Sequence, residues 1–249
     1  MSMEIISLDE ALSTNSHLSA IASGCGHGTV VTAYAQTAGR GQRGNSWESA
    51  PGENITMSIL LRPEGVEPAA QFIISEAVSV GIVRVLRRYL PAVPEVAVKW
   101  PNDIYVGDGK ICGILIEHAI VGRRIDYSVA GIGINVNQSR FLSDAPNPVS
   151  MTQFTGCRYE VGMLVREFAA EILSEIDKAT LSQGGAEALH ASYLSMLWRR
   201  DGFHPYHDAL TGRDIMARIA DVALTGHLTL VTPGGESATY AFKEVSAIL

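Results

Sequence analysis

The fold is decided by residues 96–118, which read Val96-Ala-Val-Lys-Trp-Pro-Asn-Asp-Ile-Tyr-Val-Gly-Asp-Gly-Lys-Ile-Cys-Gly-Ile-Leu-Ile-Glu-His118. Short apolar runs at 96–99, 104–106 and 113–118 are separated by Pro-Asn-Asp and Gly-Asp-Gly, residues typical of tight turns. A Val-Gly-Arg turn then leads into a further strand-like run at 125–135. Because such short links join antiparallel neighbours, the stretch predicts a largely antiparallel sheet and not a doubly wound parallel one.

The same reading extends in both directions from this stretch. It predicts strands at 29–36 and 55–61, long polar loops at 37–53 and 138–150, and helices at 69–89 and 161–197, the last interrupted at Gly184-Gly185. After Arg199 the pattern changes to short strands at 214–223, 228–232 and 238–242. We therefore expect an α/β (α+β) fold with a mixed, largely antiparallel sheet, followed by a small C-terminal β-barrel.

Composition excludes several classes of protein. The chain has 249 residues with 19 basic and 26 acidic side chains, and its net charge of −7 argues against nonspecific binding of nucleic acid. Three cysteines without CxxC spacing predict neither a disulfide framework nor a thiolate metal site. The N-terminus has no signal-peptide pattern, and we see no stretch that approaches the ~20 apolar residues of a membrane span. We expect a cytoplasmic protein.

The loop Gly39-Arg-Gly-Gln-Arg-Gly44 matches the dinucleotide-binding pattern GxGxxG in letters only. That pattern requires a helix after its last glycine, whereas Asn45-Ser-Trp-Glu-Ser-Ala-Pro-Gly follows here and is not helical. The loop is either a solvated surface segment or an anion-binding loop built from N–H groups and guanidinium forks.

The segment Lys99-Trp-Pro-Asn-Asp103 favours the interpretation of the loop as part of a binding site. Pro101 should end a strand and start a turn, so that Lys99 and Asp103 project at the sheet end with Lys110 close by. A lysine there suits a developing oxyanion or a phosphate, although a surface ion pair on a hairpin would give the same pattern.

A third element is the strand Gly131-Ile-Gly-Ile-Asn135. Its alternating glycines leave one strand face without side chains, so that a flat ligand could approach the backbone and Asn135 could bind a base edge. The alternative is tight strand packing.

Taken together, these segments resemble the catalytic domain of biotin protein ligases over most of the chain. The resemblance rests on Ser13-Thr14-Asn15, Gln36, the 39–47 loop, and residues 99–103, 110–117 and 131–135, which occur in the family's order. It implies a class II synthetase-like catalytic domain at 1–200 and an SH3-like barrel at 201–249. Because the Ser-Thr-Asn motif begins at residue 13, we expect the monofunctional type, which lacks an N-terminal DNA-binding domain.

The resemblance also implies an activity. The family forms biotinyl-5′-AMP from biotin and ATP and transfers biotin to one lysine of a biotin carboxyl carrier domain of a carboxylase. ATP and Mg²⁺ are the expected cofactors, and the protein alone is not expected to provide a complete metal site. The expected partners are biotin, ATP and the carrier domain, without nucleic acid or membrane, and a homodimer is possible through a sheet edge.

The resemblance also implies roles for the residues that match the family's motifs. The biotin-binding set is Ser13, Thr14, Asn15, Gln36, Arg40, Gly41, Gln42, Lys110 and Gly113. The adenylate-binding set is Gly39, Arg40, Trp47, Asn102, Lys110, Gly133 and Asn135, with Trp47 covering the adenine. The residues expected to act in the reaction are Lys110, Arg40, Asp103 and Lys99, where Asp103 positions either the acceptor amine or magnesium-bound phosphate. No nucleophile is assigned, because no covalent enzyme intermediate is needed.

Gln42 departs from the family, in which a second arginine is common at this loop position. Glutamine offers hydrogen bonds without a net charge, so the Gln42 side-chain contact is in doubt. Three further residues are predicted to have no functional role. Cys112 is expected to be a small buried residue, and His204 and His207 are expected to be ordinary side chains without an acidic partner.

Three alternative functions were weighed. A lipoate ligase of the same superfamily also adenylates a carboxylate, but its Arg-Arg-Gly-Gly-Gly type of loop is absent. A biotin-ligating repressor would need a DNA-binding segment before residue 13. A non-catalytic biotin-binding module is disfavoured because both lysines, Asp103 and Arg40 are present.

Overall fold

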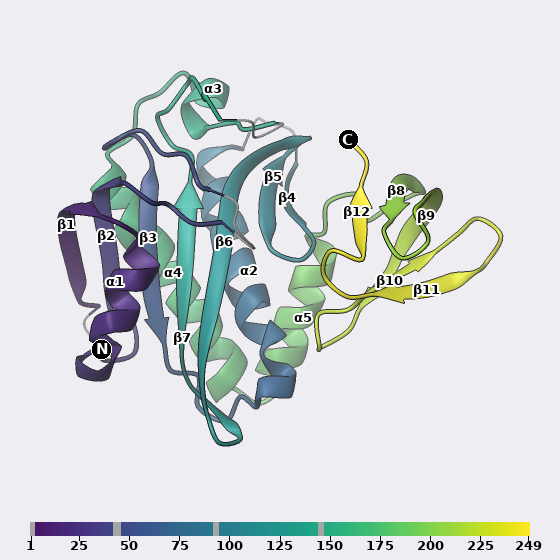
Figure 1. Ribbon diagram of the computed structural model, residues 1–249, viewed down its shortest axis with the longest axis horizontal. Coiled ribbons are helices and arrows are strands. Elements are labelled where there is room, and N and C mark those ends of the chain that lie inside the picture. The colour runs from purple at the N-terminus through teal and green to yellow at the C-terminus, as the bar shows by residue number, and fades with distance from the viewer. Residues whose placement is uncertain (1–2, 42–45, 92–94, 144–146) are drawn as a thin grey trace.

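The structure is a computed structural model that describes residues 3–41, 46–91, 95–143 and 147–249. These residues form a mixed sheet with helices on both faces and a smaller antiparallel sheet near the C-terminus (Figure 1). The predicted fold class is confirmed. The elements of the larger part are β1 (Ile5–Ala11), α1 (Thr14–Ile21), η1 (Ala22–Gly24), β2 (Val30–Gln36), β3 (Ile55–Leu61), η3 (Pro68–Ala70), α2 (Phe72–Tyr89), β4 (Val96–Lys99), β5 (Asp103–Val106), β6 (Gly109–Val121), β7 (Arg124–Ile134), α3 (Met151–Thr155), α4 (Val161–Leu181) and α5 (Gly185–Ser195).

The larger sheet has the strand order β1-β2-β3-β7-β6-β5-β4. Among its described strands β1 and β2 run parallel, while every other neighbouring pair is antiparallel. The successive hairpins from β4 to β7 are the ones that the turn residues predict. The β4–β5 turn comprises residues 100–102 and contains a cis peptide bond between Trp100 and Pro101.

Helices cover both faces of this sheet. Figure 1 shows α1 in front of it and α2, α4 and α5 behind it. The side-chain alternation of β3 explains the arrangement, because successive strand residues point to opposite faces. Ile59 packs in the main core with α2 and α4, whereas its neighbour Leu60 packs with Leu18 of α1. The central strand β3 is consequently buried along its whole length.

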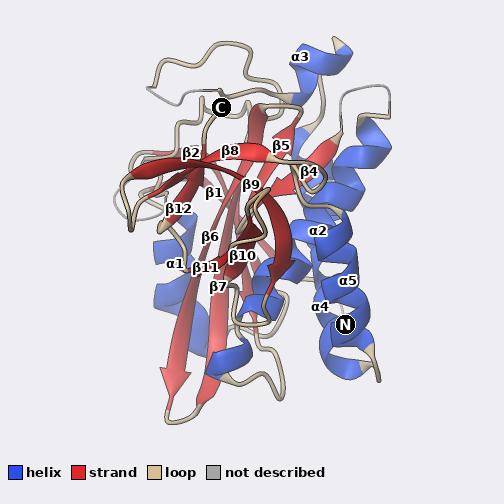
Figure 2. Ribbon diagram, turned by 90° about the vertical axis from the view of Figure 1, so that its right-hand side faces the viewer, coloured by secondary structure: helices blue, strands red, loops and turns tan. Residues whose placement is uncertain are grey.

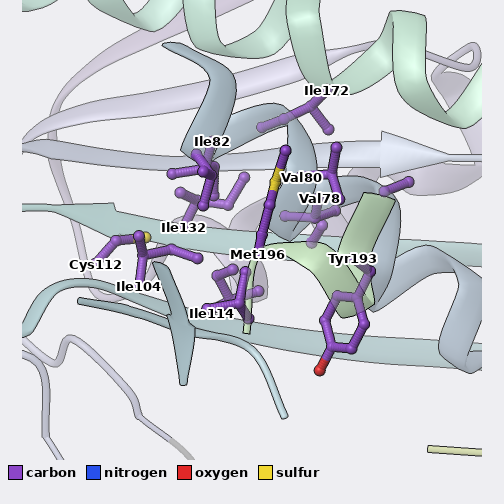
Figure 3. Packing of buried hydrophobic residues seen from close by; sticks show 14 of the residues in the cluster. Val78, Val80, Ile82, Ile104, Cys112, Ile114, Ile132, Ile172, Tyr193 and Met196 are labelled. Atoms are coloured by element: carbon purple, nitrogen blue, oxygen red, sulfur yellow. The ribbon is translucent and has the colours of Figure 1, made fainter. Parts of the chain in front are cut away.

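The helix α2 corrects one expectation from the sequence. The segment Pro68–Tyr89 contains an 18-residue window with a mean hydropathy of 1.6 and is long and apolar enough to cross a membrane, although no such stretch was expected. However, 67% of its apolar window is buried inside the molecule. Figure 3 shows Val78, Val80 and Ile82 packed among core side chains from the sheet and α4. The apolar character of α2 is that of a core helix.

The smaller sheet contains β8 (His204–Asp208), β9 (Arg213–Val222), β10 (Leu228–Val231), β11 (Ser237–Tyr240) and β12 (Val245–Ala247) in the order β11-β10-β9-β8-β12. Figure 2 presents this sheet toward the viewer. Trp100 Nε1 donates to Gly226 O (2.9 Å), and Arg199 Nη1 donates to Ile248 O (2.7 Å). Tyr206 and Leu228 belong to the same hydrophobic cluster as the large sheet. The two sheets are therefore joined by both polar and apolar contacts.

Six elements were not predicted from the sequence: β1, α1, η1, α3, β8 and β12. Both β1 and β12 are edge strands, so their stabilisation comes from one neighbour and not from a repeating local pattern. Within α1 only Thr14, Asn15 and Leu18 are buried, which is too little for a recognisable apolar stripe.

Candidate functional site

One cavity of about 950 Å³ brings the predicted residues together. Its wall is formed by the start of α1, the end of β2, the first half of β6, the end of β7, the β4–β5 turn and the edge of the smaller sheet. It is lined by Ser13, Thr14, Asn15, Gln36, Arg40, Gly41, Trp47, Lys99, Asn102, Asp103, Lys110, Gly113, Gly133 and Asn135. Of the other two predicted residues, Gly39 lies against the backbone of Trp47 and Gln42 falls outside the described residues.

A buried polar cluster forms one end of the cavity. Thr14 N donates to Gln36 Oε1 (2.9 Å), and Ser58 Oγ donates to Asn15 Oδ1 (2.6 Å) while lying 2.8 Å from Thr14 Oγ1. Ser13, Thr14, Asn15 and Ser58 are all less than 9% exposed. A buried side chain with satisfied hydrogen bonds is held in one orientation, so Thr14, Asn15 and Ser58 are fixed before any ligand binds. Ser13, Thr14, Asn15, Gln36 and Ser58 are referred to below as the polar cluster.

Three glycines make room for this arrangement. A Cβ atom on Gly131 would lie 2.1 Å from Asn15 Oδ1, and one on Gly133 would lie 2.3 Å from the Trp47 ring. A Cβ on Gly113 would lie 2.8 Å from the same ring. The expectation of an open strand face was therefore wrong: the amide of Asn15 and the indole of Trp47 occupy the space above the glycines. The glycines are required because these side chains approach the backbone closely.

The lysine end of the cavity lies at the β4–β5 turn. Lys110 Nζ lies 2.7 Å from Asp103 Oδ2, and about a third of each side chain is exposed. Lys99 turns away from them, donating to the hydroxyl of Tyr105 (3.0 Å) and lying 5.7 Å from the centre of the Trp198 ring. The predicted proximity of Asp103 and Lys110 is confirmed, and Lys99 lines the same cavity through a different set of contacts.

The turn itself is held from beneath by α5. Tyr193 is fully buried and donates its hydroxyl to Pro101 O (2.8 Å). Burial raises the pKa of the Tyr193 phenol well above its ordinary value, so the donor stays protonated. The position of Asn102 and Asp103 therefore depends on a helix that is remote in sequence.

Arg40 is oriented by a carboxylate that the sequence reading did not assign to the site. Glu117 Oε2 accepts hydrogen bonds from both Arg40 Nη2 (3.0 Å) and Asn15 Nδ2 (2.8 Å). One acceptor thus links the arginine of the loop to the polar cluster. A guanidinium has five N–H donors, so several remain for a ligand anion.

Two buried polar atoms in the cavity wall have no partner among the described residues: Trp47 Nε1 and Asn135 Oδ1. Asn135 is 2% exposed, and its amide nitrogen donates to Val149 O (3.0 Å), which assigns the remaining oxygen to the role of acceptor. Buried polar groups normally have partners, and leaving one unpaired costs about 1–3 kcal/mol. The pair of orphaned atoms marks a place where a ligand can supply the missing hydrogen bonds.

Glu48 connects the two long loops beside the cavity. Its carboxylate accepts from the backbone N–H groups of Leu142 and Ser143 and from Gln138 Nε2, at 2.7–3.0 Å. Burial opposes ionisation of Glu48, but the hydrogen bonds from Ser143, Leu142 and Gln138 outweigh it and hold the pKa below its ordinary value. The loop that carries Trp47 is thereby fastened to the loop after β7.

Cys112 and His207 were both predicted to be ordinary side chains, and the structure gives a different outcome for each. Cys112 is fully buried, and burial raises the pKa of its thiol well above the ordinary value, as expected for an unreactive core residue. The statement that His207 lacks an acidic partner was wrong, because His207 Nδ1 lies 2.8 Å from Asp214 Oδ1 on the adjacent strand β9. Strand pairing created this contact, which sequence spacing could not reveal.

Comparison with solved structures defines the class of fold. Biotin protein ligase from Aquifex aeolicus, solved in complex with biotin and ATP, superposes with a TM-score of 0.77 at 23% identity, covering 98% of this chain and 97% of that one. The Leishmania major enzyme in complex with biotinyl-5-AMP superposes with a TM-score of 0.66 at 20% identity, covering 97% of this chain and all of that one. The fold is that of biotin protein ligases.

Comparison of sequences gives a similarity to one family. Residues 13–135, just under half of the chain, match the model of the Biotin/lipoate A/B protein ligase family. It is 35% identical to the bifunctional ligase/repressor BirA of Salmonella typhimurium over 71% of its length, and spans 52% of that protein. It is 34% identical to a biotin--[acetyl-CoA-carboxylase] ligase of Paracoccus denitrificans over 58% of its length and 61% of that protein. The chain thus spans about half to three fifths of these relatives.

Several residues that line the cavity or support its lining residues were not predicted from the sequence. Ser58 sits within a uniformly buried strand, where an isolated serine carries no signal by itself. Glu117 lies within the motif 110–117. Alternation along a strand indicates the face on which a side chain lies, but it does not identify the partners of Glu117. Contributions from the smaller sheet, such as Phe242 and Lys243, depend on how the two sheets meet.

Proposed function

We propose that this chain activates biotin with ATP to form biotinyl-5′-AMP and then transfers biotin to a lysine of a carboxyl carrier domain. The observation that carries the proposal is the composition of a single cavity. It combines a preformed polar cluster, a lysine paired with an aspartate, and two orphaned buried polar atoms beside an indole. These three parts suit a ureido ring, a carboxylate meeting a phosphate, and an adenine, respectively.

The polar cluster would bind the ring end of biotin. A ureido group offers one strong carbonyl acceptor and two N–H donors, and the cluster presents hydroxyl and amide groups of both kinds. Because Ser58 and Gln36 already orient Thr14 and Asn15, binding would require little reorganisation of these side chains. Ser13 and Gly41 would complete the wall around the ring and the valeryl chain.

Lys110 would act where the carboxylate of biotin meets the α-phosphate of ATP. In this step a carboxylate oxygen attacks the phosphorus, a new O–P bond forms, and the bond to pyrophosphate breaks. The two reacting groups are both anionic, so a cation between them lowers the barrier. Asp103, at 2.7 Å from Lys110, would hold the ammonium group in place, and the free N–H groups of Arg40 would bind the same anions.

The adenine would occupy the region of Trp47 and Asn135. The indole offers a flat face for stacking, and Asn135 Oδ1 would accept a hydrogen bond from the exocyclic amine. Gly113 and Gly133 lack side chains, so they would leave room for the indole and for the adenine stacked on it. Gly39 would help indirectly, because a Cβ atom there would lie 2.6 Å from Trp47 O.

Mg²⁺ would enter as the salt of ATP. The described parts of the chain contain no group of three His, Cys, Asp or Glu side chains that could hold a metal ion. Mg²⁺ is usually bound by one or two carboxylates together with phosphate oxygens and water, so Asp103 fits as the carboxylate supplied by the chain. The ion would neutralise charge on the leaving pyrophosphate.

Transfer follows from the same geometry. The amine of the acceptor lysine attacks the acyl carbon, an amide bond forms, and AMP leaves with the electrons of the broken C–O bond. The attacking amine loses a proton to solvent, and Asp103 at the cavity wall is the side chain we assign to orient the amine. In this proposal residues 1–200 supply the chemistry as the catalytic domain, and residues 201–249 close one side of the cavity.

The decisive experiment incubates the purified chain with a carboxyl carrier domain, Mg-ATP and either biotin or lipoate. Mass spectrometry should show a carrier domain heavier by one biotin, with no addition from lipoate. A Lys110→Ala variant is the matched control for trace contamination by a host ligase. Modification by lipoate alone, or equal modification by the variant, would refute the proposal.

A further inference from the structure

Lysine is rare in this chain and concentrated at the cavity. Of 19 basic residues four are lysines, at positions 99, 110, 178 and 243. Three of them line the cavity, whereas Lys178 on α4 pairs with Glu175 at 2.8 Å. Lysine carries a compact point charge on a flexible stem and is a common phosphate ligand, while arginine prefers flat bidentate partners. The placement of the lysines points to a phosphate-rich ligand.

Lys243 has a backbone conformation that a lysine rarely adopts. It lies in a tight turn between β11 and β12, in which Glu244 N donates to Ala241 O (3.0 Å) and Ala241 N donates to Glu244 Oε2 (2.7 Å). Its φ angle is +75°, in the left-handed region that favours glycine. Strain of this kind tends to occur at functional positions. The hydrogen bonds of the turn come from Ala241 and Glu244, so the Lys243 side chain is not needed to hold it.

The turn faces the β4–β5 hairpin of the larger sheet. The rings of Phe242 and Trp100 meet edge to face, with centroids 6.1 Å apart. Ala247 of β12 packs against the cluster that contains Trp198 and Tyr105, and Figure 1 shows β12 beside the β4–β5 hairpin. Lys99 precedes Trp100 in the larger sheet, and Lys243 follows Phe242 in the smaller one. Both lysines line the cavity, so they border it from opposite sheets.

These two lysines are also the cations of the cavity whose charge is not offset. Arg40 and Lys110 are paired with Glu117 and Asp103. Within the described part of the chain neither Lys99 nor Lys243 forms an ion pair; the Lys243 ammonium lies 5.9 Å from the centre of the Phe242 ring. Both residues line the cavity, so both charges act on an anion bound there.

We propose that Lys243 binds the terminal phosphates of ATP, together with Lys99, so that the smaller sheet supplies part of the nucleotide site. The inference rests on the proposed function, since it takes ATP as the ligand of this cavity. The α-phosphate belongs near Lys110, and the leaving pyrophosphate then extends toward the junction of the two sheets. Lys243 is a binding residue for the leaving group, and the turn of 241–244 holds it there despite the strained backbone.

The test uses Lys243→Gly and Lys243→Asn, since both residues tolerate the left-handed conformation. Calorimetry on the full chain would measure the affinities for ATP, inorganic pyrophosphate, AMP and biotin. We expect ATP and pyrophosphate to bind about tenfold more weakly, as for the loss of one hydrogen bond to a charged group, with AMP and biotin unchanged. The melting temperature should stay at or above that of the wild type, which separates this effect from unfolding.

Lys178→Met provides the matched control, because it removes a lysine outside the cavity and should leave ATP affinity unchanged. Wild-type affinity of both Lys243 variants for ATP and pyrophosphate, an equal loss for AMP, or no binding of ATP by the wild type would each overturn the assignment. Biotin-dependent release of pyrophosphate by the wild type is measured separately. Its absence would refute the proposed ligase activity, while the ratio of variant to wild-type ATP affinity bears on Lys243.

Discussion

The two ends of the cavity are built in different ways. The polar cluster around Asn15 is buried, and its side chains already hydrogen-bond to one another and to Glu117. The lysine end is drawn from two sheets and is more exposed, with Lys110 at 31%. A buried network fixes geometry and therefore selects one ligand shape, whereas exposed charges attract any polyphosphate and are screened by salt. The comparison suggests that specificity resides at the polar cluster and charge neutralisation at the lysine end.

The largest expected effect comes from removing the charge at the centre of the lysine end. Lys110→Ala should lower the rate of biotinyl-AMP formation by about 10²–10³, because one oriented charge at a reacting phosphate is lost. Pyrophosphate release under saturating biotin and Mg-ATP would measure this. Lys178→Ala is the control for loss of a lysine elsewhere, and thermal unfolding should show that both variants fold. Pyrophosphate release near the wild-type rate would remove Lys110 from the chemistry.

A single methyl group should break the polar cluster. Gly131→Ala would place a Cβ about 2.1 Å from Asn15 Oδ1, so Asn15 must move and its hydrogen bonds with Ser58 and Glu117 are disturbed. We expect biotin to bind about 10–100-fold more weakly, which corresponds to the loss of about 1–3 kcal/mol. Equilibrium titration with biotin in the absence of ATP is the measurement.

The control for this variant is Gly24→Ala, since no heavy atom lies within 4 Å of a Cβ at that position. That change should leave biotin affinity intact. If Gly131→Ala bound biotin as tightly as the control, the interlocked cluster would not be the biotin site.

The affinities for ATP and biotin should depend differently on salt concentration, which tests the two ends of the cavity separately. Raising the ionic strength from about 0.05 to 0.5 M should weaken ATP binding several-fold, because exposed charges are screened within a few ångströms at high salt. Biotin binding should change by less than about twofold, since hydrogen bonds in a buried cluster are little affected. Parallel titrations with the two ligands would measure both responses. A larger salt effect on biotin than on ATP would reverse the proposed division of the cavity.

The smallest effect concerns the connection between the loops. Hydrogen bonds lower the pKa of Glu48 in the folded chain, so its stabilising contribution is present above the unfolded pKa of about 4.5 and is lost as pH falls through the folded value. Exchange of the Leu142 and Ser143 amide protons, corrected for intrinsic rate, should accelerate as the pH falls below 4.5. Glu48→Gln should reproduce part of this acceleration at neutral pH. Amides that stay equally protected in acid would show that Glu48 does not fasten the loops.

Much of this molecule could be predicted from residues that act through local chemistry. Turn residues between short apolar runs predicted the hairpins β4 to β7, and the helical spacing of apolar residues predicted α2 and α4. Motif residues such as Ser13, Arg40, Lys110 and Asn135 all line one cavity, and their roles in binding remain predictions. These features follow from the sequence because their determinants lie within a few residues of each other.

Other features were decided by tertiary structure, because their partners are distant in sequence. The indole of Trp47 lies over Gly113 and Gly133, Glu117 joins Arg40 to Asn15, and Tyr193 supports the turn through Pro101. No pattern within one segment specifies such contacts; they require the strand order and the helix packing. The contribution of Lys243 depends further on how the smaller sheet meets the larger one. The sequence determined which chemical groups are available, and the packing of the two sheets determined which of them face the same cavity.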